Sequence, residues 1–192
     1  MKTKQMRLLR AMSVFTVGLS LVGVTPLAAK GSNCQPVDDA LNKVINTPTH
    51  IYGSMSFVPS AGGQPLTGGS IHTETIYVGG SSYTKVGGKW SRGDWTPQQV
   101  MKQEQENRQE SKYTCRYLRD ELVNGEAAVV YNTRSERSGE GSIGKIESEG
   151  QIWISKNKGL PLRQEFDIES GSSKQHHSVR YEYTNVQPPQ LE

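Results

Sequence analysis

The stretch QIWISKNKGLPLRQEFDIE, residues 151–169, decides the fold. Polar and apolar side chains alternate on both sides of a tight Asn-Lys-Gly turn at residues 157–159. In its second half, four apolar side chains are expected to share one face of a strand: Leu160, Leu162, Phe166 and Ile168. A period of two is typical of a β-strand with one apolar and one solvated face. The stretch therefore predicts an antiparallel hairpin.

The same alternation recurs along the chain and predicts about eight strands in sequential hairpins. Gly-Gly at residues 79–80 and Asn-Gly at residues 124–125 are typical of the turns between such strands. A sheet of this length with one apolar face must cover that face.

Two helices interrupt the strand pattern. The first begins near Cys34, and its apolar residues share one face: Ala40, Leu41, Val44 and Ile45. The second begins at Thr96, where Thr96, Pro97 and Gln99 match a capping box, and it runs to about residue 110. It is nearly all polar, which favours a solvated connector; a lid that faces a partner is the alternative.

One short amphipathic helix cannot shield eight flat strands, so the sheet is expected to curl. The prediction is an α+β fold: a strongly curved antiparallel half-barrel of about eight strands in a meander, wrapped over one or two helices.

Residues 1–29 have the composition of a cleaved export signal peptide. Four basic residues precede an apolar run at residues 11–24, and Leu-Ala-Ala at residues 27–29 offers small side chains for cleavage. A membrane anchor is the weaker interpretation, because a span needs roughly 20 apolar residues. Residues 31–33 lack the leucine that a lipoprotein signal places before its cysteine. We therefore expect a soluble protein exported to the bacterial periplasm, with residues 30–190 as one domain; the origin of Leu191 and Glu192 stays open.

The charge balance changes once this signal is removed. The sequence has 22 basic and 19 acidic side chains. Four of the basic ones and none of the acidic ones lie in residues 1–29, which leaves 18 against 19 and a net charge of −1. The net positive charge of the full sequence therefore comes from the signal peptide. The charge of the remaining chain does not favour binding to nucleic acid or to an anionic membrane.

The two cysteines, Cys34 and Cys115, predict one disulfide in an oxidising compartment. The bond would close a loop of 81 positions, for which the chain-entropy model gives roughly 4–5 kcal/mol. A cysteine nucleophile or a metal-binding pair is less favoured, since the chain has no C-x-x-C spacing.

No residue pattern indicates catalysis or a cofactor. The chain has no G-x-S-x-G motif. Its glycine pairs occupy hairpin turns, whereas the glycines of a phosphate-binding loop stand at the start of a helix. His72 and Glu74 share one face of a predicted strand, and His50 joins them if its strand pairs with the next. These three residues are weak candidates for a metal or acid–base site.

Aromatic side chains are the best candidates for ligand contact. Trp90 and Trp95 flank a short loop near the expected rim of the half-barrel, where they would grip an apolar or sugar ligand or, alternatively, plug the core. The candidate set is completed by Tyr83, Tyr181, Tyr183 and Phe166. Trp153 is expected to cover the outer face of the sheet or to mark a contact patch there.

Residues 152–168, IWISKNKGLPLRQEFDI, and residues 179–189, VRYEYTNVQPP, resemble the periplasmic lipoprotein-carrier (LolA/LolB-like) superfamily. In that superfamily one strand carries a Trp or a similar residue. A G-LP-R segment follows it, and the final strand then ends near Y-V-P. The resemblance implies a half-barrel whose concave face accepts acyl chains. This chain differs in its polar middle helix and in its small number of large apolar residues.

Together these patterns predict a non-catalytic, monomeric, exported carrier that holds a lipid or another hydrophobic molecule in a half-barrel cavity. The alternative is a protein–protein interaction module of the cell envelope with a filled core, and a hydrolase or metal-binding protein comes third. An open interior favours the carrier, whereas a filled interior favours the module.

Overall fold

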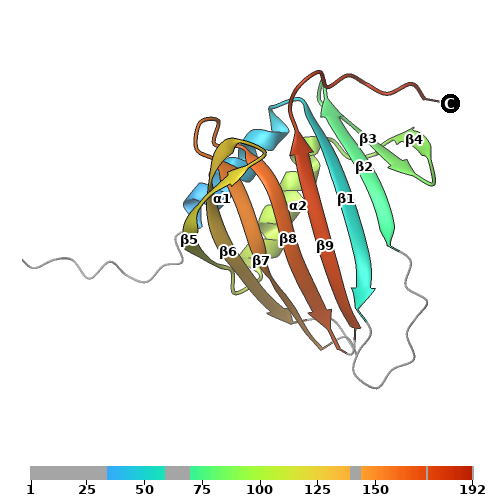
Figure 1. Ribbon diagram of the computed structural model, residues 1–192. Helices are drawn as coiled ribbons and strands as arrows, with labels where there is room; N and C mark the ends of the chain where they lie inside the picture. The colour runs from blue at the N-terminus through green and yellow to red at the C-terminus, as the bar shows by residue number, and fades with distance from the viewer. Residues whose placement is uncertain (1–33, 59–69, 139–143, 172, 192) are drawn as a thin grey trace, which may run out of the picture.

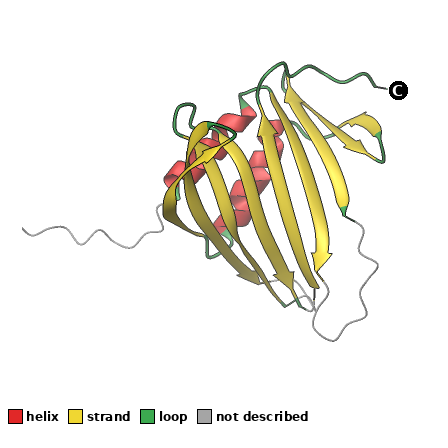
Figure 2. Cartoon of the chain, in the orientation of Figure 1, coloured by secondary structure: helices red, strands yellow, loops and turns green. Residues whose placement is uncertain are grey.

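The computed structural model describes residues 34–58, 70–138, 144–171 and 173–191. The predicted signal peptide and most of the glycine-rich loops at 58–70 and 138–144 lie outside these ranges. The nine strands of the described chain form one antiparallel sheet, and both helices lie on the same face of it (Figures 1 and 2). No helix in the described ranges is long and apolar enough to cross a membrane.

Two meanders build the sheet. The elements are, in chain order, α1 (Gln35–Ile45), β1 (Thr49–Val58), β2 (Ile71–Val78), β3 (Ser81–Val86), β4 (Lys89–Arg92), α2 (Pro97–Gln109), β5 (Thr114–Val123), β6 (Glu126–Ser138), β7 (Lys145–Ser155), β8 (Pro161–Ser170) and β9 (Ser173–Glu182). The strand order is β4-β3-β2-β1-β9-β8-β7-β6-β5, so the first and last strands pair at the centre. Because β4 and β5 form opposite edges, the chain crosses the sheet between them, and α2 lies on this crossing.

The α+β class, the antiparallel meander and the two helices are confirmed, but two parts of the prediction are wrong. The sheet has a ninth strand, β4, whose four residues are too few for alternation to be recognised. The sheet is also not strongly curled. Curling was expected because one helix could not cover an apolar face alone. In the structure two helices cover one face, and a folded-over hairpin covers part of the other.

The core on the helix side lies under α1. Val37 and Ala40 of α1 pack with Ile152 and Ile154 of β7, and all four are buried. The predicted apolar face of this helix is thus confirmed for Ala40 and for Val44, which is also buried.

A second core lies on the opposite face, which we call the outer face. Ala128, Val130 and Trp153 are buried there, and three half-buried side chains pack against them: Leu118, Val123 and Leu162. The end of the β5–β6 hairpin folds over this cluster (Figure 1). Trp153 therefore covers the outer face, one of the two alternatives predicted for it.

The expected common face of Leu160, Leu162, Phe166 and Ile168 is wrong at Leu162. The β7–β8 register shifts between Trp153 and Ile154. Such an irregularity inserts an extra residue into one strand and re-aims its side chains. Leu162 therefore packs into the outer core, whereas Phe166 and Ile168 stay on the helix side.

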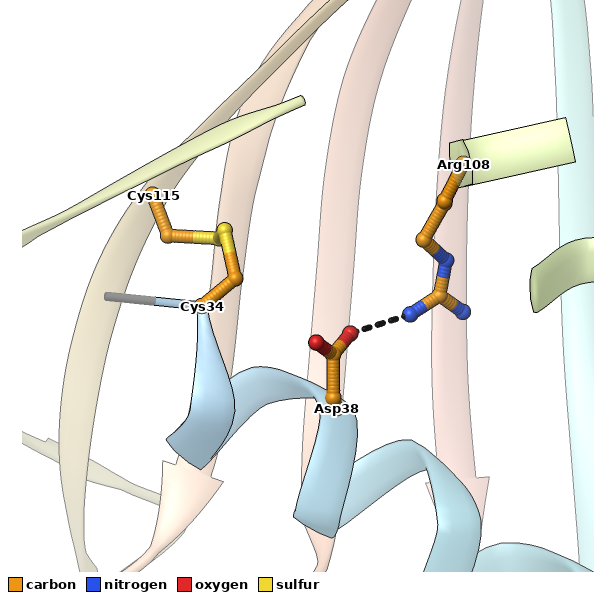
Figure 3. The surroundings of a disulfide bond; sticks show 4 residues. All are labelled: Cys34, Asp38, Arg108 and Cys115. Atoms are coloured by element: carbon orange, nitrogen blue, oxygen red, sulfur yellow. Dashed lines mark hydrogen bonds and ion pairs between the residues drawn. A yellow bond between two sulfur atoms is a disulfide. The ribbon is translucent and has the colours of Figure 1, made fainter. Parts of the chain in front are cut away.

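The predicted disulfide between Cys34 and Cys115 is confirmed (Figure 3). It joins the residue that precedes α1 to the edge strand β5, with the two Cα atoms 5.0 Å apart. Beside it, Arg108 Nη1 of α2 donates a hydrogen bond to Asp38 Oδ1 of α1 at 2.5 Å. The disulfide and this ion pair tie α1 to β5 and to α2.

The predicted capping box of α2 is confirmed. The backbone N–H of Thr96 donates to Gln99 Oε1 at 2.8 Å, and the backbone N–H of Gln99 donates to Thr96 Oγ1 at 3.3 Å. Ser82 Oγ of β3 also donates to the carbonyl oxygen of Trp95 at 2.5 Å. The start of α2 is thus fixed to the β3–β4 side of the sheet.

Reduction of the disulfide is expected to lower the free energy of unfolding by up to about 4–5 kcal/mol, because the open chain regains the entropy of its long loop. Urea denaturation of the protein with and without dithiothreitol measures the loss. The double variant Cys34→Ser/Cys115→Ser should be equally destabilised and insensitive to dithiothreitol. Equal midpoints for the oxidised and reduced protein would contradict this expectation.

Gly150→Ala is expected to destabilise the fold by about 1–3 kcal/mol, since its Cβ would collide with the carbonyl oxygen of Glu165 and the Cβ of Phe166 on β8. Gly53→Ala is the matched control in β1. Its Cβ would lie 2.7 Å from Thr73 Oγ1, the end of a side chain that can rotate away. Thermal unfolding of both variants tests the difference, and a loss at Gly53 as large as at Gly150 would argue against the described packing.

Candidate binding site

Helix α2 turns one side toward the sheet. Pro97, Val100, Met101, Glu104 and Arg108 share this side, because their spacing follows one face of a helix. Pro97 is buried, and Val100, Met101 and Arg108 are half-buried. Glu104, in the middle of the same side, is exposed to solvent. The centre of α2 therefore does not close onto the sheet.

Three tyrosines are close enough to Glu104 for its negative charge to help raise their pKa: Tyr77, Tyr113 and Tyr181. Burial is the largest cause of the raised pKa in each case, because a low-dielectric surrounding disfavours the phenolate. Tyr181 donates from its hydroxyl to Gln164 Oε1 at 2.6 Å. Its ring stacks on that of Tyr183, whose hydroxyl donates to the Pro161 carbonyl oxygen at 2.5 Å. Tyrosine rings thus lie on the face of the sheet near α2.

Farther along the strands, the same face of the sheet becomes apolar. One row runs across β2, β1, β9 and β8: Ile71, Met55, His177 and Phe166. The next row includes Phe57 and Ile168. Ile71 is 45% exposed and the others are half-buried, so none of these side chains is enclosed as a core residue is.

His177 and Phe166 form the β9–β8 end of this row. Their rings stack with centroids 4.8 Å apart and planes 4° from parallel. Burial lowers the pKa of His177, which favours the neutral imidazole. The row is therefore uncharged at neutral pH, as contact with an apolar molecule requires.

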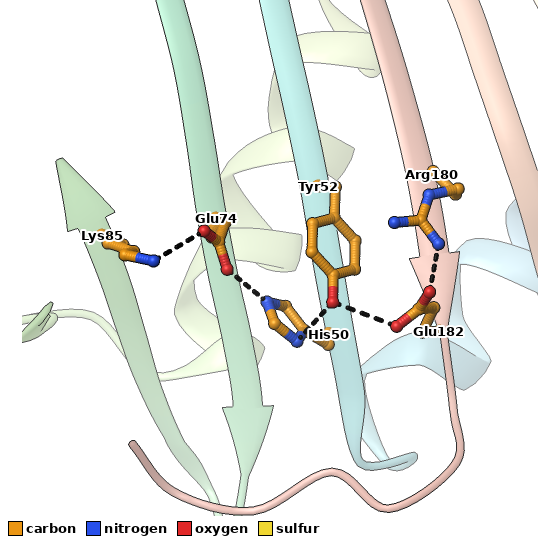
Figure 4. Close-up of polar contacts among 6 residues, drawn as sticks. All are labelled: His50, Tyr52, Glu74, Lys85, Arg180 and Glu182. Carbon is orange, nitrogen blue, oxygen red and sulfur yellow. Dashed lines mark hydrogen bonds and ion pairs between the residues drawn. The ribbon is translucent and has the colours of Figure 1, made fainter. Parts of the chain in front are cut away.

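The outer face carries a chain of polar contacts across four strands (Figure 4). Lys85 Nζ donates to Glu74 Oε1 at 2.9 Å, and His50 Nε2 lies 3.0 Å from Glu74 Oε2. His50 Nδ1 lies 3.1 Å from the Tyr52 hydroxyl, which donates to Glu182 Oε2 at 3.0 Å. Glu182 in turn pairs with Arg180.

Ionised Glu74 and Glu182 can only accept hydrogen bonds. The chain of contacts therefore places the lysine, imidazole, hydroxyl and guanidinium groups around two carboxylates.

The structure brings together two of the three weak metal candidates. His50 and Glu74 are in contact, whereas His72 Nε2 lies 2.9 Å from Ser70 Oγ, farther along β2. Both carboxylate oxygens of Glu74 are already engaged, one by Lys85 and one by His50. Within the described residues no group of three or more His, Cys, Asp or Glu side chains is placed to hold a metal ion.

The six ligand-contact candidates are divided between the faces. Phe166, Tyr181 and Tyr183 lie on the helix side, where Phe166 belongs to the apolar row, Tyr181 lies near α2 and Tyr183 stacks on Tyr181. Tyr83 and Trp90 lie on the outer side near the β4 edge, and Lys85 Nζ lies 5.6 Å from the centre of the Trp90 ring. Trp95 is half-exposed between β4 and α2.

Sequence reasoning missed Glu104, Tyr77 and Tyr113. Glu104 has no signal of its own in a helix rich in Gln and Glu. Tyr77 continues the alternation of its strand, and that signal could have placed it on the covered face. Tyr113 precedes β5, so it becomes part of the site only through the crossing of the chain.

No protein-family model matches this chain, and no curated protein matches its sequence. Among solved structures, LprF from Mycobacterium bovis is similar at 12% identity, with a TM-score of 0.43 over 81% of this chain and 95% of that one. A DUF1329 family protein from Desulfovibrio piger is similar at 12% identity, with a TM-score of 0.27 over 80% and 94%. TM-scores this low carry no argument about function. The resemblance to the lipoprotein-carrier superfamily therefore stays a prediction.

Glu74→Gln is expected to lower the free energy of unfolding at pH 7 by about 0.5–1 kcal/mol. The hydrogen bond from Lys85 is the largest cause that lowers the pKa of Glu74 below its ordinary value of 4.5. A depressed folded-state pKa gives stability that is complete above the ordinary value and is lost as the pH falls below it. Urea denaturation from pH 7 to pH 3 should show the difference between the two proteins shrinking below pH 4.5.

Glu149→Gln is the matched control for this prediction. Glu149 lies on the same face and forms no ion pair with any other described residue, so its substitution is expected to leave stability unchanged at each pH. A pH-independent loss in Glu74→Gln would show that the carboxylate stabilises the fold by some other means than its charge.

Proposed function

We propose that this protein is a non-catalytic binding protein that holds an apolar or aromatic small molecule, such as a lipid, between α2 and the sheet. The observation that carries the proposal is the exposure of Glu104 at the centre of the sheet-facing side of α2. A helix that packed fully against the sheet would bury this position. The ends of α2 are fixed by the capping box and by the Arg108–Asp38 pair, and the proposal places the ligand under its middle.

The walls of this space support an apolar ligand with a polar end. Tyr181 and its neighbouring tyrosines present aromatic rings, which contact apolar chains and rings well and keep a hydroxyl for one hydrogen bond. Beyond them, Met55, Phe57 and Phe166 are half-buried. Covering these side chains with a ligand would remove apolar area from water, at about 25 cal/mol per Å².

The compartment is the second part of the proposal. The Cys34–Cys115 disulfide agrees with an extracytoplasmic location, since such bonds persist in oxidising compartments. Together with the predicted signal peptide at residues 1–29, it supports export to the bacterial periplasm. We propose that the protein acts there as a monomer without a cofactor.

A second candidate function is the interaction module of the cell envelope. The edge strand β5 favours it, because Tyr117 and Leu122 are large side chains that are 53% and 70% exposed on that strand. An unpaired edge with exposed apolar side chains is a site where a partner strand can add to a sheet.

The neutral fluorescent probe N-phenyl-1-naphthylamine tests the binding site. The protein is expected to bind it with enhanced fluorescence, and Glu104→Trp should weaken binding at least tenfold, since the new ring would fill the space under α2. Glu106→Trp is the matched control: Glu106 is exposed on the opposite side of α2, so probe affinity should not change. The proposal would be contradicted if the native chain did not bind the probe, or if both variants bound it with equal affinity.

Native mass spectrometry of protein purified from the periplasm identifies the natural occupant. A co-purified lipid or other small molecule that is absent from Glu104→Trp would support the carrier. An empty protein together with a stoichiometric protein partner, lost on Leu122→Lys, would favour the interaction module.

A further inference from the structure

A separate hollow lies on the outer face, away from α2. It has a volume of about 430 Å³ and extends over β2, β1, β9 and β8, and residues of the β5–β6 turn border it. Val123 and Leu162 form an apolar part of its lining, and Ser54 and Ser178 supply hydroxyls. Among the described residues, the lining holds two arginines, Arg163 and Arg180, beside His72, and it contains no carboxylate.

The register of the sheet places these arginines directly opposite each other. Arg163 of β8 pairs with Arg180 of β9. Directly opposed side chains on neighbouring strands lie about 4.5–5.5 Å apart at Cβ, and like charges in this position destabilise a sheet. The pair therefore needs neutralising groups.

Two carboxylates that do not line the hollow neutralise the arginines and leave some of their donors free. Glu165 accepts from Nε and Nη2 of Arg163, and Glu182 accepts from Nη1 of Arg180. Nη1 of Arg163, and Nε and Nη2 of Arg180, make no hydrogen bond to another described residue. A guanidinium has five N–H donors in a planar fork, so each arginine keeps several for a ligand.

Aromatic rings hold both guanidinium groups in place. Arg163 Cζ lies 4.9 Å from the centre of the Trp153 ring, and Arg180 Cζ lies 4.2 Å from that of Tyr52 (Figure 4 shows the latter pair). Stacking of this kind favours arginine over lysine and fixes the plane of the fork. The donors are thus ordered before any ligand arrives.

We propose that this hollow is an oxyanion site that binds the phosphate or carboxylate of a small amphiphilic molecule. The oxyanion would accept hydrogen bonds from the free donors of Arg163 and Arg180, because guanidinium forks match the geometry of these anions. An adjoining apolar segment of the ligand would contact Val123 and Leu162. The site lies on the face opposite the proposed apolar site, and neither depends on the other.

Hexyl phosphate is the probe for this site. In a ¹⁵N NMR titration of the full chain, with ionic strength held constant by sodium chloride, saturable shifts are expected at Asn124 and at the Arg180 side chain. Inorganic phosphate should bind more weakly, since it lacks the apolar segment, and hexan-1-ol should cause no such shifts.

Three glutamine variants and one lysine variant separate the hollow from general charge. Arg163→Gln and Arg180→Gln should each weaken hexyl phosphate binding at least tenfold, which corresponds to about 1.4 kcal/mol. Arg134→Gln removes the same charge from the same face outside the hollow, and it should change affinity less than twofold. Arg180→Lys keeps the charge without the fork and should recover part of the affinity.

Vesicle pelleting distinguishes a lipid headgroup from a free ligand. If vesicles of phosphatidylglycerol pellet the native chain and those of phosphatidylcholine do not, and Arg180→Gln abolishes pelleting, the oxyanion belongs to a headgroup. Hexyl phosphate binding without pelleting assigns it to a free molecule. The proposal is overturned if the native chain shows no saturable shift with either phosphate probe, or if all three glutamine variants weaken binding alike.

Glu104→Trp keeps this test distinct from that of the apolar site. The variant should lose N-phenyl-1-naphthylamine and bind hexyl phosphate as the native chain does. Loss of both ligands would show that the two sites are coupled and would contradict the independence argued above.

Discussion

The chain leaves the sheet at one edge and must re-enter it at the other. This constraint follows from the pairing of β1 with β9, which places β4 and β5 at opposite ends of the strand order. Eight intervals of about 4.8 Å make the sheet nearly 40 Å wide, whereas a helix of 13 residues spans about 20 Å. The crossing segment is therefore a connection that is fixed near both of its ends. A polar helix suits this task, because it does not need to bury its whole length against the strands.

Both faces of the sheet carry their own core, and this division organises the molecule. On the helix side, α1 covers Ile152 and Ile154, while the neighbouring residue Trp153 points to the outer face and is covered by the β5–β6 hairpin. Because both faces are covered, the sheet is stable without closure into a barrel, and it is not strongly curled. It also leaves two partly covered regions, one under α2 and one beside the folded hairpin, and each has a different chemistry. The first is aromatic and apolar, and the second presents paired guanidinium groups.

Local signals in the sequence were sufficient for most of the elements. The Thr96–Gln99 capping box, the Asn-Gly turn and the alternation in β1, β2 and β5–β9 each depend on residues close together in the chain, so they could be recognised without a structure. The disulfide followed from the presence of only two cysteines. The shape of the sheet could not be inferred in this way, because it depends on what covers each face. The bulge that turns Leu162 outward is likewise set by pairing with β7, which alternation in β8 does not show.

The candidate sites were harder to predict than the fold. Arg163 and Arg180 are register partners on one face only because β8 and β9 pair in one register, and a shift of one residue would turn them to opposite faces. Glu104 is informative through its exposure, which no pattern in a helix of Gln and Glu can reveal. The aromatic candidates were selected from the sequence by residue type alone. The face of the sheet on which each one lies is set by the strand pairing.

The central β1–β9 pairing also governs the order in which the fold can be completed. His50 and Glu182 are partners although 132 positions separate them in the chain, and the nine partnered residues of β1 must wait for the last strand to emerge. Contacts of such sequence separation are slow to form. Until the last strand is present, the β1–β4 meander has β1 as an open edge. The joining of the two meanders is thus deferred until the whole chain is available.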